Sequence, residues 1–143
     1  MRIATRALII KNGCVLMCKY NDEYGEFYVC PGGGHEENEN MTENVKRELF
    51  EELSVDIEVG DFAFIRETFF TYGEKTTHQI EHYFYCEIKN NGVLSRGQIV
   101  DSSCIGFEWL EIEKLDRFRT FPVKFREALL CKGTPLYIDE TKF

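Results

Sequence analysis

The sequence predicts an α+β fold in which helices pack on a mixed β-sheet. The order of its segments supports this class, because strand patterns come first, one strong helix follows, and further strands and a final helix complete the chain. A helix pattern over residues 41–53 and a long aromatic hairpin over residues 56–89 are the clearest signals. With 143 residues the chain fits one domain, which we expect to span residues 1–143.

The N-terminal part reads as strands. Residues 2–11 and 14–20 are apolar runs that favour β-structure, and Asn12-Gly13 between them is the strongest short hairpin signal. We therefore expect the two runs to pair as antiparallel strands. A polar loop and a short strand over residues 27–30 follow.

The next segment is a run of three glycines after Pro31. Such a run cannot form a helix and makes a poor strand, so a loop is expected. Glycines let the backbone approach a ligand closely, and Gly33 and Gly34 are therefore candidate substrate-binding positions.

The helix over residues 41–53 is predicted by a cap and an apolar stripe. Asn40 and Glu43 have capping-box spacing, so the helix is expected to begin near residue 41. The stripe packs one side of the helix on a core and leaves the neighbouring side polar. Its residues are Met41, Val45, Leu49 and Leu53.

The C-terminal half predicts further strands and one more helix. Residues 56–72 and 76–89 are rich in Phe, Tyr, Ile and Thr, and the Gly-Glu-Lys turn between them indicates a hairpin. A strand is expected over residues 107–111. A helix is expected over residues 122–130, with Pro122 in its first turn.

Composition and charge exclude several functional classes. The net charge is −8, and residues 36–58 alone hold nine acids against two bases, which argues against broad nucleic-acid binding. No signal peptide or membrane span is apparent, and the six cysteines include no C-x-x-C pair. We expect a cytoplasmic monomer or homodimer with neither a nucleic-acid nor a membrane partner.

Three glutamates share one helical face beside the apolar stripe. Glu48, Glu51 and Glu52 project within an arc of roughly 100°, because residues three and four apart stack on one side. Their mutual repulsion costs about 0.2–0.5 kcal/mol per pair, and a bound cation would convert it into attraction. Carboxylate oxygens suit Mg²⁺, Mn²⁺ or Ca²⁺, and Mg²⁺ fits best where phosphate is present.

The same segment resembles the Nudix box, G-x5-E-x7-R-E-U-x-E-E-x-G-U, in which U is aliphatic. Six polar or glycine positions and two aliphatic positions match at the family's spacing, from Gly33 through Glu39 to the run that ends at Val55. The one departure is Ser54, where the family has a glycine just past the helix. Serine in a left-handed conformation costs on the order of 1 kcal/mol, so stability is affected more than activity.

The resemblance implies a Nudix fold, which is an α/β/α sandwich, and a Mg²⁺-dependent pyrophosphohydrolase that cleaves a nucleoside diphosphate linked to another moiety. Mn²⁺ is an expected substitute. It also implies site roles by position. Metal ligands are Glu48, Glu51, Glu52 and the Gly32 carbonyl, and an orienting pair is formed by Arg47 and Glu39.

The general base stays open at this point. Glu48 and Glu52 are candidates within the box, where Arg47 completes the catalytic set. Asp101 in a predicted loop and Glu81 on a predicted strand are candidates outside it, with Asp101 slightly favoured. Glu81 and the strand residue Arg6 are also candidate substrate-binding groups.

Two substrate classes and one non-catalytic alternative fit the sequence. The short chain and aromatic hairpin favour a nucleoside triphosphate, as in MutT-like enzymes, over a nucleotide sugar such as ADP-ribose. A ligand-binding or regulatory module without activity is disfavoured, because the box glutamates are intact. Five aromatic residues are expected to be core rather than base-stacking, namely Phe69, Phe70, Tyr72, Tyr83 and Tyr85.

Overall fold

The computed structural model of the protein describes residues 1–95, 103–134 and 136–142. The strands are β1 (Arg2–Leu8), β2 (Ile10–Lys11), β3 (Cys14–Asp22), β4 (Gly25–Val29), β5 (Gly32–Gly34), β6 (Ile57–Tyr72), β7 (Lys75–Ile88), β8 (Cys104–Glu111), β9 (Thr120–Phe121) and β10 (Tyr137–Glu140). The helices are α1 (Met41–Leu53), α2 (Phe125–Leu130) and the 3-10 helices η1 (Lys89–Asn91) and η2 (Ile112–Arg117).

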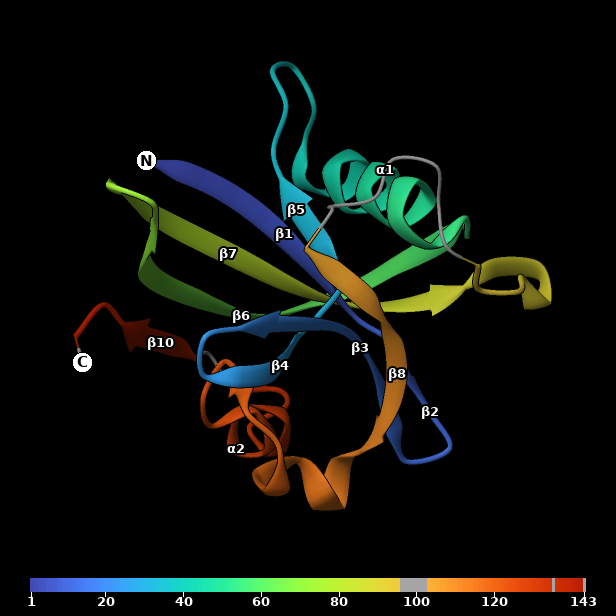
Figure 1. The fold of residues 1–143 in the computed structure, drawn as a ribbon. Helices are drawn as coiled ribbons and strands as arrows, with labels where there is room; N and C mark the ends of the chain where they lie inside the picture. The colour runs from blue at the N-terminus through green and yellow to red at the C-terminus, as the bar shows by residue number, and fades with distance from the viewer. Residues whose placement is uncertain (96–102, 135, 143) are drawn as a thin grey trace.

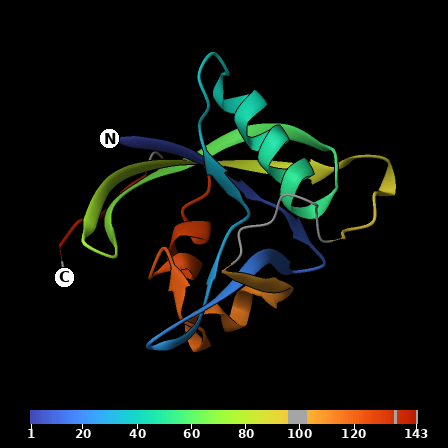
Figure 2. The ribbon, with the colours of Figure 1, turned by 45° about the horizontal axis from the view of Figure 1, so that its top comes forward.

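Within these residues the strands form two mixed sheets (Figures 1 and 2). One sheet has the order β10-β6-β7-β1-β5, in which β1 runs parallel to β7 and β10 runs parallel to β6. The other has the order β2-β3-β4-β9, with β8 paired to β3. In Figure 1, α1 lies on one side of the paired sheets and α2 on the other. The α+β fold class predicted from the sequence is confirmed.

Two apolar clusters hold these layers together. The larger cluster joins the sheets to α2 and η2, and it includes Leu8, Tyr83 and Phe125. The second lies beneath α1, where Val45 and Leu49 are fully buried against the sheets. No helix in the described parts of the chain is long and apolar enough to cross a membrane.

The N-terminal strands pair differently from the prediction. Asn12 and Gly13 do form the predicted turn, with φ values of 53° and 74°. However, only β2 pairs with β3 through this turn, whereas residues 2–8 form β1 in the other sheet. Strand β1 pairs with β7 on one edge and with β5 on the other, and its neighbouring residues Ala7 and Leu8 are both buried, so it is a central strand of that sheet.

The glycine run is also a correction, because Gly32–Gly34 is not a loop. It forms β5, which pairs antiparallel with β1. Gly32 has a φ of 146°, and a Cβ there would lie 2.0 Å from the carbonyl oxygen of Thr5. Glycine therefore allows a strand so close to β1 that a side chain would not fit.

The C-terminal prediction is partly confirmed. The long hairpin is β6 and β7, and the predicted strand over residues 107–111 belongs to β8. The last helix begins at Phe125 rather than Pro122. The Pro122 carbonyl accepts a bond from the Thr120 hydroxyl at 2.8 Å, and Val123 N–H donates to Glu140 at 2.8 Å, so this backbone is bonded outside a helix.

Candidate active site

Helix α1 begins and ends as the sequence predicts. The Asn40 side chain accepts from the Glu43 N–H at 2.8 Å, and the Glu43 carboxylate accepts from the Asn40 N–H at 3.0 Å. At the other end, Ser54 adopts the left-handed conformation with φ 56° and ψ 35°. Both ends are fixed by local chemistry, so the direction in which the helix presents its glutamates is fixed as well.

Buried Asn44 fastens this helix to the sheet, and sequence reasoning did not single it out. Its side-chain oxygen accepts from the Thr5 hydroxyl at 2.8 Å, and its amide donates to the Gly34 carbonyl at 3.1 Å. Asn44 is fully buried, so these bonds also satisfy a polar group that would otherwise be costly. The signal in the sequence was a polar residue one position before Val45 of the apolar stripe.

Arg47 is the centre of the acidic face. Its guanidinium donates to both carboxylate oxygens of Glu39, at 2.8 and 3.0 Å, and to the Gly34 carbonyl at 2.9 Å. It also donates to Glu48 and Glu51, each at 3.1 Å. The hydrogen bonds from Arg47 lower the pKa of Glu39. The planar fork thus ties the strand β5 to three acidic side chains.

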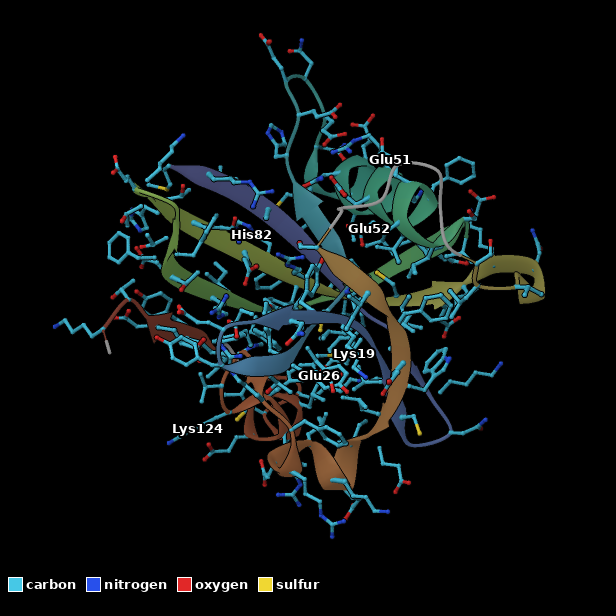
Figure 3. All side chains as sticks on the ribbon, in the orientation of Figure 1. Lys19, Glu26, Glu51, Glu52, His82 and Lys124 are labelled. Atoms are coloured by element: carbon cyan, nitrogen blue, oxygen red, sulfur yellow. The ribbon has the colours of Figure 1, made fainter. Side chains whose placement is uncertain are left out.

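Glu52 lies on α1 beside Glu51, as Figure 3 shows. Burial raises the pKa of Glu52, and repulsion from Glu48 adds to this effect, whereas Arg6 and the Gly32 N–H act in the opposite direction. A carboxylate in this position gains from a nearby cation.

Glu48 occupies space left by the missing side chain of Gly33. A Cβ on Gly33 would lie 2.6 Å from the carboxylate carbon and from one of its oxygens. The glycine therefore makes room for the Glu48 carboxylate against β5, next to the Gly32 carbonyl.

The donor set of this site fits a hard divalent ion. It offers the carboxylates of Glu48, Glu51 and Glu52 and the Gly32 carbonyl, and Mg²⁺ prefers such oxygen ligands. Across the described residues, no three His, Cys, Asp or Glu side chains stand in the arrangement of a formed metal site. Arg47 contacts two of these carboxylates instead, so metal binding requires small side-chain rearrangements.

A second ionic cluster lies next to the glycine strand. Arg6 donates to the Gly32 carbonyl at 3.2 Å and to Glu81 at 2.9 Å. Arg66 donates to the other oxygen of Glu81 at 2.8 Å, and Gln79 and Tyr83 also donate to this carboxylate. Glu81 is only 2% exposed.

The surroundings of Glu81 disfavour it as the general base. Burial by itself would raise the pKa of this carboxyl, but Arg6 and Arg66 outweigh burial and lower the pKa to about 2. A base works best with a pKa near the operating pH. The other candidate outside the helix, Asp101, lies outside the described residues.

A cleft of about 1250 Å³ opens beside this cluster, between the two sheets. Arg6 and Arg66 line the wall formed by β1 and β6, whereas Tyr20, Phe27 and Phe121 line the wall formed by β3, β4 and β9. We call the second of these the aromatic wall; the first carries the two arginines together with their acidic partners. Sequence reasoning missed these three aromatic residues, because they come from three strands whose pairing it did not foresee.

The aromatic residues of the β6–β7 hairpin divide into two groups. Tyr83 is core, as predicted, and stacks on Phe64 with ring centroids 4.3 Å apart. Phe69 and Phe70 are each 39% exposed and line the cleft, so the expectation that they are core is wrong. Both lie near the end of β6, close to the turn that joins it to β7.

Comparison with known protein families and sequences points to one family. The family model for the NUDIX domain matches residues 1–129. The nucleoside triphosphatase NudI of Salmonella paratyphi B is 28% identical over 136 residues, which cover 88% of this chain and 92% of that protein.

Solved structures share the fold. The MutT protein from Bacillus halodurans has a TM-score of 0.72 at 19% identity, covering 96% of this chain and 87% of that one. An ADP-ribose pyrophosphatase from Streptococcus suis has a TM-score of 0.61 at 15% identity, and the match covers 99% of this chain and 98% of that one.

Proposed function

The chain belongs to the NUDIX family and is a hydrolase of phosphoric anhydride bonds, and from this premise we propose that it hydrolyses nucleoside triphosphates with Mg²⁺. The observation that carries the proposal is the position of the acidic face of α1. Arg6 contacts both the Gly32 carbonyl beside that face and Glu81 at the wall of the cleft. The glutamates of α1 do not themselves line the cleft, so we propose that the phosphates of a nucleotide bound there extend past Arg6 to reach them. We assign this activity to a single domain spanning residues 1–143.

Each residue of the acidic face has a proposed role. Glu48, Glu51, Glu52 and the Gly32 carbonyl hold the metal, which when bound neutralises the diphosphate and lowers the pKa of a coordinated water. Arg47 and Glu39 keep the glutamates in place. Glu52 or Glu48 accepts the proton of the attacking water.

The substrate's phosphates need cationic partners as well as metal. Arg6 is proposed to contact them, because it lines the cleft and its guanidinium is held between Glu81 and the glycine strand. Gly33 and Gly34 follow Gly32 on the same strand, and their backbone groups are proposed to complete the phosphate site.

Nucleoside triphosphates are the preferred substrate class because the Salmonella relative is a nucleoside triphosphatase of similar length. A nucleotide sugar is the second candidate, on the ground of the cleft's size. Its volume of about 1250 Å³ exceeds the roughly 300–1,000 Å³ of ordinary small-molecule pockets, and a protein of the same fold is an ADP-ribose pyrophosphatase.

A product-resolved screen with Mg²⁺ or Mn²⁺ tests the proposal. Triphosphates are expected to give a nucleoside monophosphate and pyrophosphate, whereas a nucleotide sugar would give a monophosphate and a sugar phosphate. Turnover of sugars alone would select the second candidate. Binding without turnover of any compound would overturn the proposal in favour of a ligand-binding module.

A pair of variants tests the assigned site. Glu52→Gln keeps the size of the side chain but removes its charge, and we expect loss of turnover with an unchanged fold by circular dichroism. Glu37→Gln changes an exposed glutamate before the helix and should retain activity. Near-normal turnover by Glu52→Gln would contradict the metal-binding role.

A further inference from the structure

Arg119 lies at the rim of the cleft, far from the acidic face of α1 in the sequence. It follows η2, and its guanidinium donates to both oxygens of Asp22 at 2.7 and 2.8 Å. Asp22 ends β3, at the tip of the hairpin with β4. The bidentate pair ties the hairpin to the segment that leads into β9.

This guanidinium also covers an aromatic cluster. Its carbon lies 5.0 Å from the ring centroid of Phe27, 5.5 Å from that of Phe121 and 5.7 Å from that of Tyr24. Phe27 in turn stacks on Tyr20, with centroids 5.4 Å apart and planes inclined by 15°. All of these residues line the cleft.

Arg119 is suited to bind a flat ring rather than a phosphate. The flat face of a guanidinium stacks on aromatic rings without needing net charge, and Asp22 holds both arms of this guanidinium in place. The Arg119 side chain is 34% exposed although it covers three rings, so it forms the outer layer of the cluster. Phosphate-directed charge is found elsewhere, at Arg6 beside the glycine strand.

We propose that Arg119 is a specificity-determining residue that stacks on the nucleobase of the substrate, and that Asp22 positions it. The inference rests on the proposed function, because it assumes a nucleotide in the cleft. It places the base against the aromatic wall of the cleft and leaves the phosphates to Arg6 on the opposite wall.

The test compares Arg119→Lys with a matched control. Lysine keeps the charge and loses the flat, forked group. Arg126→Lys is the control, because Arg126 is also about one-third exposed and paired with an aspartate, Asp116, but does not line the cleft. KM and kcat are measured for nucleoside triphosphates, together with the inhibition constant of inorganic tripolyphosphate, which has no base.

We expect Arg119→Lys to raise KM by roughly tenfold, with kcat changed less than about twofold, as fits the loss of one stacked guanidinium. Inhibition by tripolyphosphate should not change. Asp22→Asn should raise KM in the same direction, and Arg126→Lys should not. Phe27→Leu, which removes a ring beneath the guanidinium, should also raise KM.

Two results would overturn this assignment. Equal weakening of nucleotide binding and tripolyphosphate inhibition would make Arg119 a phosphate-directed charge, and unchanged kinetics would leave it no role toward substrate. Both results require an active wild-type enzyme. An inactive wild type would instead refute the proposed function, so the two failures are distinguishable.

Discussion

Replacement of Glu81 by glutamine should reveal how strongly the buried ionic cluster holds the protein together. Glu81 lies between Arg6 and Arg66, with N–O distances of 2.9 and 2.8 Å, and is 2% exposed. Glutamine keeps the shape of the side chain but leaves two arginines without their shared carboxylate. Removing one partner of a buried ion pair costs about 3–5 kcal/mol.

The pKa of Glu81 gives an independent magnitude. It falls from 4.5 to about 2 in the folded protein, because the two arginines outweigh the opposite effect of burial. At 1.36 kcal/mol per pKa unit this shift contributes about 3 kcal/mol of stability. Since the folded pKa is depressed, the contribution is complete above pH 4.5 and is lost as the pH falls toward 2. About 2 kcal/mol of it should be lost by pH 3.

Urea unfolding at pH 7 and pH 3 measures both effects. At pH 7 the Glu81→Gln variant should be less stable than wild type by about 3–5 kcal/mol. The difference between their free energies of unfolding should be smaller by about 2 kcal/mol at pH 3, because only wild type loses the Glu81 contribution as the pH falls.

A surface ion pair provides the control for this measurement. Figure 3 labels Lys19 and Glu26 on neighbouring strands, where half-buried Lys19 pairs with exposed Glu26 at 2.5 Å. The difference in free energy of unfolding between wild type and Glu26→Gln should change far less between pH 7 and pH 3, because water screens this pair. If the difference between wild type and Glu81→Gln were the same at both pH values, the depressed pKa and its assigned cause would be wrong.

Three further substitutions test the acidic face and its helix. Ser54→Gly should raise the free energy of unfolding by about 1 kcal/mol, since the backbone of this residue is in the left-handed conformation. An unchanged free energy of unfolding in urea would show that serine is not strained there. Gly33→Ala should lower kcat about 100-fold by displacing Glu48, and unchanged kcat would show that Glu48 tolerates movement. Arg47→Lys should raise the Mg²⁺ concentration needed for half-maximal activity roughly 10- to 100-fold, because lysine cannot bind Glu39 with two bonds. An unchanged Mg²⁺ titration would show that Arg47 does not orient the glutamates.

Local patterns explain what the sequence predicted well. Helix α1 follows from an apolar repeat and a capping box that lie within fifteen residues, and the structure has both. The β6–β7 hairpin follows from two β-favouring runs around one turn. The pairing of Arg47 with Glu39 was implied by family resemblance and is present in the structure.

Non-local pairing explains what the sequence did not predict. The glycine run forms a strand only because β1 lies beside it, and β1 lies there only because it joined the other sheet. The aromatic wall of the cleft has the same origin. Its residues Phe27 and Phe121 are adjacent because β4 and β9 pair in parallel, across ninety-four positions of sequence that give no local signal.

The buried ionic cluster is difficult to explain by stability alone. Replacement of a buried ion pair by well-packed apolar residues is often neutral or stabilising, because taking charges out of water is expensive. Here the hydrogen bonds continue from the Gly32 carbonyl through Arg6, Glu81 and Arg66 to Glu140. They join β5, beside the proposed metal site, to β10 at the other edge of the same sheet. Two arginines and two glutamates alternate along that line, so the charges balance and the bonds hold both guanidinium groups in a fixed orientation before any substrate arrives.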